Sequence, residues 1–406
     1  MLQATIRNFL KLETSGAILL LIAATAAMIL KNSPLGGLYE AFLDTPVVIR
    51  VGALEIAKPL LLWVNDGLMA VFFFMIGMEV KREILDGELS QPSQVMLPLI
   101  AGIGGILVPA GLYYLLTMDN PAQLRGWAIP TATDIAFALG ILGLAGPRVP
   151  TTLKIFLMTL AIIDDLGAIL IIALFYASDL SLVSISVAAV AIGGLVALKL
   201  RGTTSIAPYI LVGIVLWVAV LKSGVHATLA GVILGFFIPA RAKDPDGEVH
   251  SPLERMIHEL HPAVAFGILP LFAFANAGVN LEGMSISSVL SGIPLAIAVG
   301  LFFGKQIGVF GFAWVAIMLG WCQRPAGAGW LQMYGVAALC GVGFTMSLFI
   351  GSLAFEDGGF AYTRPDRLGI IVGSIASGLL GYLVLRFSVR HEKADGEQNP
   401  EDGFRS

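Results

Sequence analysis

The chain has 406 residues, of which 57% are hydrophobic and only 13% are charged, whereas about 25% are charged in a typical soluble domain. Its charges are clumped between charge-free stretches of about the ~20 residues that cross a ~30 Å hydrocarbon core, which indicates an all-α, polytopic membrane protein and excludes a soluble enzyme. Two cysteines, Cys322 and Cys340, form neither a disulfide framework nor a metal-ligand spacing, and no basic patch indicates nucleic-acid binding, so we expect no cofactor and no nucleic-acid partner.

Twelve apolar segments are predicted to cross the membrane. The first resembles a secretory signal peptide, because basic residues precede it and residues 24–26 (ATA) resemble a cleavage site. Eleven further segments follow, however, and membrane insertion needs no removable signal. The predicted spans are residues 14–30, 60–78, 93–116, 122–146, 151–178, 182–200, 204–221, 224–240, 257–278, 287–318, 330–354 and 368–387.

Between the first two spans, one segment has the character of a β-hairpin. Residues 47–56 are β-branched and aliphatic around Gly52 and Ala53, with a proline on either side. A lone two-stranded hairpin is marginal in water. It therefore pairs with a second copy of the chain across a two-fold axis, or it folds over its own helix ends.

Charge asymmetry predicts the orientation. An even number of spans places both termini on one side, and the segments on that side hold 16 Lys and Arg, against 7 on the other side. The positive-inside rule then favours cytoplasmic termini. We expect one transporter domain over residues 1–390 and a polar, disordered cytoplasmic tail over 391–406.

Two triplets of spans share one rhythm. Spans three to five (about residues 93–178) and ten to twelve (about 287–388) each contain a glycine-rich middle segment between two long ones. Seven spans separate the triplets, so corresponding helices run in opposite directions, which predicts an inverted repeat with broken helices in spans four and eleven. Glycine is also common wherever membrane helices pack closely, so the pattern alone does not decide.

Four ionisable residues stand out inside the predicted spans, where each costs several kcal/mol unless it is paired or solvated. Asp134 follows Pro130 in the predicted break of span four, where a carboxylate can offset the positive ends of half-helices. Lys305, in the opposite repeat, can offset the negative ends. Asp164 and Asp165 lie centrally in span five.

The aspartate pair suggests ion exchange. A buried carboxylate pair can carry protons, and its deprotonated oxygens are hard ligands suited to Na⁺ or Li⁺. A site that holds either a cation or protons, but not both, meets the minimum requirement for cation/proton antiport. If Lys305 pairs with Asp164, cation binding would release the lysine, whose proton could be part of the transported charge.

Seven motifs together resemble the NhaA family of sodium/proton antiporters, over about residues 10–388. This resemblance implies an electrogenic, dimeric antiporter of the bacterial inner membrane, joined through the outer hairpin, that expels Na⁺ or Li⁺ for a larger number of protons and supports pH and sodium homeostasis. The motifs are FFFMIGMEVKREILDGEL (72–89), PTATDIAFALG (130–140), LAIIDDLGAILIIALFY (160–176), HATLAGVILGFFIP (226–239), LPLFAFANAGV (269–279), FFGKQIGV (302–309) and GFTMSLFIGSLAF (343–355).

The resemblance also implies roles for single residues. Asp164 and Asp165 match the ion-binding pair, Thr133 and Asp134 match the broken-helix residues, and Lys305 matches the buried lysine.

Four further residues match positions associated with pH response, namely Glu79, Arg82, Glu83 and His226. From the residues alone, 79–88 would be a solvated helix end and His226 a packing or interfacial histidine.

One position departs from the family. Ile257 stands where a glutamate is expected, and Glu254 or Glu259 could substitute for it, which leaves the pH threshold open.

Two other functions compete with antiport. A sodium-coupled symporter of a small organic anion would share the inverted repeat and the broken helices, but should have Asn or Gln beside the breaks. An intramembrane aspartyl protease would need carboxylates on two helices and a Gly-x-Gly-Asp stretch, which the sequence lacks.

Overall fold

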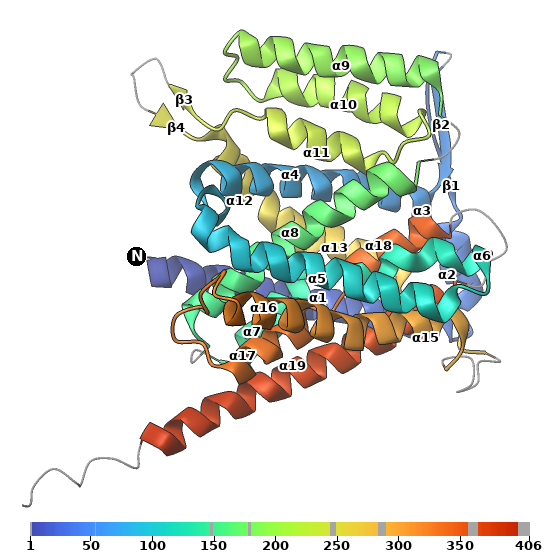
Figure 1. Cartoon of the computed structure of the whole chain (residues 1–406). Helices are drawn as coiled ribbons and strands as arrows, with labels where there is room; N and C mark the ends of the chain where they lie inside the picture. The colour runs from blue at the N-terminus through green and yellow to red at the C-terminus, as the bar shows by residue number, and fades with distance from the viewer. Residues whose placement is uncertain are drawn as a thin grey trace, which may run out of the picture.

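The chain folds into a bundle of long helices that lie roughly side by side (Figure 1). The computed structural model describes residues 2–52, 54–146, 149–177, 180–243, 249–282, 290–355 and 364–396. The first elements are α1 (Leu2–Lys31), α2 (Gly36–Leu43), β1 (Pro46–Val51), β2 (Leu54–Pro59), α3 (Leu60–Trp63), a π-helical turn (Val64–Leu68), α4 (Met69–Asp86) and a short 3₁₀ turn (Glu88–Ser90).

The middle of the chain contains the first interrupted helix and the longest buried one. Its elements are α5 (Pro92–Thr117), α6 (Pro121–Leu124), a 3₁₀ helix (Arg125–Thr131), α7 (Ile135–Leu144), α8 (Thr151–Phe175), α9 (Leu182–Leu200), α10 (Ala207–Leu221), α11 (Thr228–Phe237), β3 (Ala242–Lys243) and β4 (Val249–His250).

The last part contains the second interrupted helix. Its elements are α12 (Pro252–Ala263), a π turn (Val264–Ile268), α13 (Leu269–Asn276), α15 (Gly292–Val299), two π turns (Gly300–Gly304 and Gln306–Phe310), α16 (Gly311–Met318), α17 (Trp330–Leu339), α18 (Phe344–Ala354) and α19 (Asp366–Gly396). Residues 397–406, the rest of the predicted tail, lie outside the described residues.

Within the described residues, eight helices are long and apolar enough to cross a membrane, and two bent helix pairs raise this number to ten. The 15-residue α10 and the 10-residue α11 are shorter apolar helices in the positions of predicted spans seven and eight. The bends confirm the predicted breaks: the Pro121–Thr131 segment meets α7 at 45°, and α17 meets α18 at 40°. The chain is thus a mostly helical, multi-pass membrane protein.

The predicted hairpin is also confirmed, and it is slightly longer than expected. β1 and β2 pair antiparallel from Pro46 opposite Pro59 to Val51 opposite Leu54. β1 is followed by Gly52, whose φ of 61° lies in the left-handed region that favours glycine.

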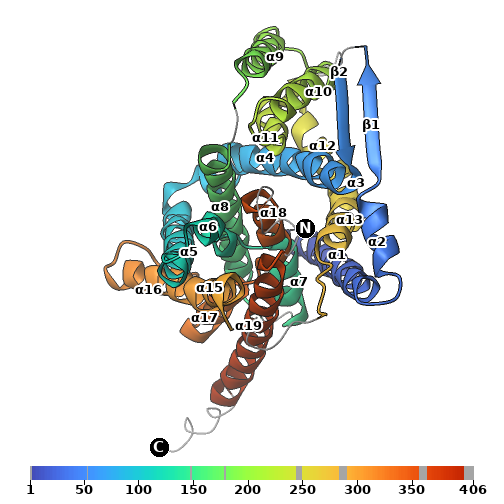
Figure 2. The same cartoon turned by 90° about the vertical axis from the view of Figure 1, so that its right-hand side faces the viewer.

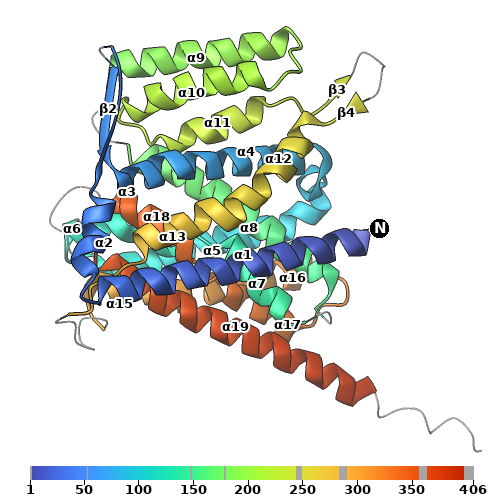
Figure 3. The same ribbon diagram turned by 180° about the vertical axis from the view of Figure 1, so that it is seen from behind.

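The hairpin is anchored to helices of its own chain. The Trp63 indole N–H donates to the Val47 carbonyl (3.1 Å), and the Lys222 ammonium donates to the Glu55 carbonyl (2.7 Å). The hairpin stands at one end of the bundle, and β3 and β4 lie at the opposite end, on the side of the N-terminus and the C-terminal end of α19 (Figures 1 and 3).

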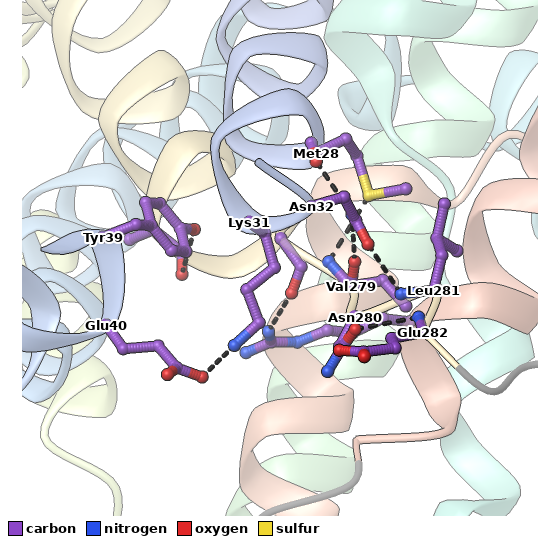
Figure 4. Close-up of polar contacts among 12 residues, drawn as sticks. Met28, Lys31, Asn32, Tyr39, Glu40, Val279, Asn280, Leu281 and Glu282 are labelled. Atoms are coloured by element: carbon purple, nitrogen blue, oxygen red, sulfur yellow. Dashed lines mark hydrogen bonds and ion pairs between the residues drawn. The ribbon is translucent and has the colours of Figure 1, made fainter. Parts of the chain in front are cut away.

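Polar side chains fasten α1 and α2 to the segment after α13 at the hairpin end (Figure 4). The Asn32 amide donates to the Val279 carbonyl (2.7 Å) and accepts from the Leu281 N–H (2.8 Å). The Tyr39 hydroxyl donates to the Phe274 carbonyl (2.5 Å). These contacts hold the C-terminal end of α13 in place at the hairpin end of the bundle.

Seen end-on, the helices α9, α10 and α11 form one edge, and α8 and α18 lie nearer the middle (Figure 2).

Elsewhere in the bundle, α5 crosses the helix that contains Lys305 so closely that the backbones touch. A Cβ atom on Gly308 would lie 2.6 Å from the Gly104 carbonyl carbon, so only glycine fits.

Replacing Gly308 with alanine should therefore force α5 and this helix apart. We expect a loss of about 1–3 kcal/mol in the free energy of unfolding, as for other overpacked sites. Denaturant titration of the purified protein in detergent measures it. Gly311→Ala is the matched control, because a Cβ there meets no atom within 4 Å. Equal stabilities for the two variants would contradict the close crossing.

Candidate ion-binding site

Asp164 and Asp165 lie in the middle of α8 and are buried, with exposed fractions of 1% and 2%. Asp164 Oδ2 lies 2.6 Å from the Lys305 ammonium and 2.6 Å from the Thr133 hydroxyl oxygen. The predicted ion pair between Lys305 and Asp164 is thus present. The Oδ1 atoms of both aspartates are buried without a hydrogen-bond partner among the described residues. Such atoms are the ones that a bound cation or proton would satisfy.

Thr133 connects the aspartate to the second broken helix. Its hydroxyl oxygen lies 2.6 Å from Asp164 Oδ2 and 2.9 Å from the Cys340 carbonyl oxygen, just after α17. Because a hydroxyl has one hydrogen, Thr133 can donate to only one of them at a time.

Asp134 lies where two half-helices begin. Its carboxylate accepts from the Phe137 N–H in the first turn of α7 (3.1 Å). It also accepts from the N–H (2.9 Å) and hydroxyl (2.5 Å) of Thr345, in the first turn of α18. A negative charge at two helix N-termini is what a charge-compensating role requires.

Sequence reasoning missed Thr345 and Ser347 as partners of the first break. Ser347 donates to the Ile129 carbonyl across the crossing (2.7 Å). Both residues stand in the GFTMSLFIGSLAF motif, but a hydroxyl in an apolar helix does not by itself indicate its partner. The one available signal was their position directly after the Gly341-Val342-Gly343 break.

A cavity of about 730 Å³ reaches from α12 to Asp165. Of the two ion-site aspartates, Asp165 is the one whose side chain lines it. The titratable and charged residues on its wall are Glu79, Arg82, Asp134, Asp165, Glu254, His258 and His261.

Two of the four residues matched to pH response do not line this cavity. Glu83 accepts from the Arg82 guanidinium (2.8 Å) and from the Glu88 N–H (3.1 Å), so it holds the 3₁₀ turn that follows α4. Partial burial, and then the charge of Glu83, raise the pKa of Glu88 above its usual value. His226 lies in the turn before α11, and its buried Nε2 has no hydrogen-bond partner among the described residues.

The structure distinguishes between the two acids that could replace the glutamate expected at Ile257. Ile257 itself is buried in the cavity wall, where Glu254 also lies. Glu259 instead pairs with Arg255 (2.7 Å), and both side chains are exposed.

Crossed broken helices beside a buried ionisable pair define a membrane transporter of small ions. The sequence matches the Na⁺/H⁺ antiporter 1 family over residues 7–385, and the chain belongs to this family. It is similar to the Na(+)/H(+) antiporter NhaA of Pseudomonas fluorescens, with 58% identity over 97% of this chain and 99% of that protein. It is also similar to Na(+)/H(+) antiporter NhaA 2 of Magnetococcus marinus, with 59% identity over 96% and 99%.

Membership confirms the predicted family. It also makes the chain a Na⁺/H⁺ antiporter rather than an enzyme, which excludes the aspartyl protease. Nothing in the described site favours the organic-anion symporter, because the groups beside the aspartates are carboxylates, hydroxyls and an ammonium.

Replacing Thr345 with valine should destabilise the crossing of the broken helices, because Asp134 loses a buried charge-assisted hydrogen bond. We expect a loss of roughly 1.5–3 kcal/mol in unfolding free energy, measured by denaturant titration. Ser352→Ala in the same helix is the control, since that hydroxyl bonds only locally, to the Phe349 carbonyl. If the two losses are equal, the Thr345 contact is not special.

Proposed function

We propose that the chain is an electrogenic antiporter that expels Na⁺ or Li⁺ in exchange for protons, with Asp164 and Asp165 as the ion-binding pair. The observation that carries the proposal is the asymmetry of this pair. Asp164 is held by Lys305 and Thr133, whereas Asp165 lines the cavity. A cation entering from the cavity would meet Asp165 first and then compete with the lysine for Asp164.

This competition supplies the coupling. A cation bound between the two carboxylates requires both to be deprotonated, and its charge replaces that of the lysine ammonium on Asp164. Lys305, once displaced into a buried environment, releases its proton, because an unpaired buried charge is costly. Protons on Asp165 and Lys305 would then be exchanged for one cation, which moves net charge and lets the membrane potential drive export.

Asp134 and Thr133 also stabilise the two breaks in this proposal. Asp134 compensates the positive ends of α7 and α18, and Thr133 links Asp164 to the break after α17. Neither break then requires an unpaired polar group in the membrane.

The proposed arrangement in the membrane is twelve spans, with α10 and α11 counted as spans seven and eight. Both termini would lie in the cytoplasm of a bacterial inner membrane, as the positive-inside bias favours. The cavity then opens to the cytoplasm, because its wall includes the first turns of α12, which follows β4 at the end of the bundle where α1 begins. Alternating access would move the inverted halves, about residues 93–178 and 287–388, against the rest of one transporter domain.

We also propose a homodimer joined through the hairpin. Val48 and Ile49 of β1 are about half exposed, and β1 has one free edge in its two-stranded sheet. Pairing with a second copy would cover this edge. The bonds of the hairpin to Trp63 and Lys222 fix its position and are compatible with a dimer.

The central test uses purified protein in vesicles that report internal pH. Addition of Na⁺ should move protons in the wild type, and Asp164→Asn or Asp165→Asn should reduce the rate at least 100-fold, because each removes a ligand charge. Asp119→Asn, which changes an exposed aspartate in the turn after α5, should retain the wild-type rate. Normal exchange by the Asp164 variant would refute the site.

We further propose that Glu254 takes the place of the glutamate expected at Ile257 in the pH response. It faces the cavity with Glu79 and Arg82 from α4, His258 and His261 from its own helix, and Asp134 and Asp165 beyond. Its negative charge attracts both protons and Na⁺ to the cavity. The residues set aside above, Glu83 and His226, could then act on pH response only indirectly.

Replacing Glu254 with glutamine removes this charge, so the buried carboxylates should lose their protons at lower pH. The pH of half-maximal exchange should fall by a few tenths of a unit, and the KM for Na⁺ should rise, as the pH series in the vesicle assay measures. Glu259→Gln, whose carboxylate lies outside the cavity, should match the wild type. A larger shift in the Glu259 variant would reverse the assignment.

A further inference from the structure

We infer that a hydrogen bond between Gln306 and Tyr334 positions Lys305 against Asp164 and so sets how readily Na⁺ displaces the lysine. The inference rests on the proposed exchange at Asp164 and Asp165. It concerns two residues to which that proposal gives no role.

The helix that carries Lys305 is irregular on both sides of the lysine. A π turn runs from Gly300 to Gly304, and another runs from Gln306 to Phe310. Turns of this type have i→i+5 hydrogen bonds, are rare, and occur mostly at functional sites. A helix widened on both sides of one residue holds that residue less firmly than an α-helix, so its position depends on contacts with neighbouring helices.

Gln306 makes such a contact. Its side-chain amide N–H donates to the Phe302 carbonyl (2.5 Å), and its amide oxygen accepts from the Tyr334 hydroxyl of α17 (2.5 Å). Gln306 is buried, at 7% exposure, and Tyr334 is partly buried, so this bond is partly shielded from competing water. The Tyr334 ring is held in turn by an edge-to-face contact with Phe310, with ring centroids 5.5 Å apart.

The bond completes a chain of contacts around the ion site. From Tyr334, α17 leads to the break, where the Cys340 carbonyl lies 2.9 Å from the Thr133 hydroxyl oxygen. Thr133 lies 2.6 Å from Asp164 Oδ2, which is 2.6 Å from Lys305. Lys305 is therefore joined to Asp164 directly and, through its neighbour Gln306, by way of the second broken helix.

Through this chain of contacts, the Gln306–Tyr334 bond affects how easily Lys305 leaves Asp164. When a cation replaces the lysine on Asp164, the Lys305 helix is free to shift at its widened turns, and the Gln306–Tyr334 bond opposes that shift. The bond thereby favours the lysine-bound form over the cation-bound form. It also links the position of Lys305 to the broken helix, which the proposed alternating access must move.

Removing the Tyr334 hydroxyl tests this role. In Tyr334→Phe the ion pair loses alignment, so the cation competes better and the lysine gives up its proton more easily. In the vesicle assay the KM for Na⁺ should fall about threefold, the effect of one lost hydrogen bond, and the pH of half-maximal exchange should fall with it. A merely structural role would lower the amount of folded protein or the maximal rate and leave both quantities unchanged.

Gln306→Met provides a second route to the same result, because it keeps the length of the side chain and removes the acceptor. Gln306→Met also loses the bond to the Phe302 carbonyl, so the double variant should shift KM no further than Gln306→Met alone, because the Gln306–Tyr334 bond is already absent there. Tyr209→Phe is the matched control: it removes a tyrosine hydroxyl that donates to the Thr203 carbonyl (3.1 Å), away from the site.

The outcomes separate the two proposals. If the wild type and Tyr209→Phe move no protons on addition of Na⁺, the proposed function fails. If they exchange normally and the Tyr334 and Gln306 variants keep the wild-type KM and pH profile, or change only the maximal rate, the inference about the link is overturned. Additive shifts in the double variant would likewise show that the two residues act separately.

Discussion

An ionised carboxylate inside a membrane must be paired, and the contacts of Asp164 meet this requirement. One oxygen faces both Lys305 and Thr133, which lie on different helices far apart in the sequence. The desolvation cost of the charge is offset only while both helices stay in place. The same pairing is open to replacement, since any group that brings a positive charge to Asp164 can take the place of the lysine. The stability of the site and its capacity for exchange therefore have one physical origin.

The two broken helices depend on each other for the same reason. A break leaves backbone N–H and C=O groups without partners where water cannot reach them. Here the groups freed at one break are bound by the other: the Asp134 N–H donates to the Val342 carbonyl (2.7 Å), and the Thr345 N–H donates to the Asp134 carboxylate (2.9 Å). A broken helix on its own would carry unsatisfied polar groups, so each break depends on its crossing with the other.

Features marked by charged residues or glycines in apolar segments could be predicted from the sequence. Spans four and eleven, the hairpin and the ion pair of Lys305 all follow from where polar groups interrupt apolar runs. The Gln306–Tyr334 bond was beyond reach, because an amide and a phenol 28 positions apart meet only after two helices are rotated against each other. The hydrophobic periodicity of the sequence does not reveal how two helices are rotated against each other. The π turns beside Lys305 have no sequence signature either.

Helix geometry explains why Glu254 is the acid we propose in place of the glutamate expected at Ile257. Glu254, Ile257, His258 and His261 follow the spacing i, i+3, i+4 and i+7, which places them on one face of a helix, and all four line the cavity. Glu259 does not belong to this series, which explains its exposed pairing with Arg255. In the proposed replacement, the negative charge lies about one turn, roughly 4.5 Å, nearer the start of α12 than position 257 and on the same face of the helix. Because a charge acts less strongly on a group farther away, the size of its effect on the buried carboxylates would depend on this displacement.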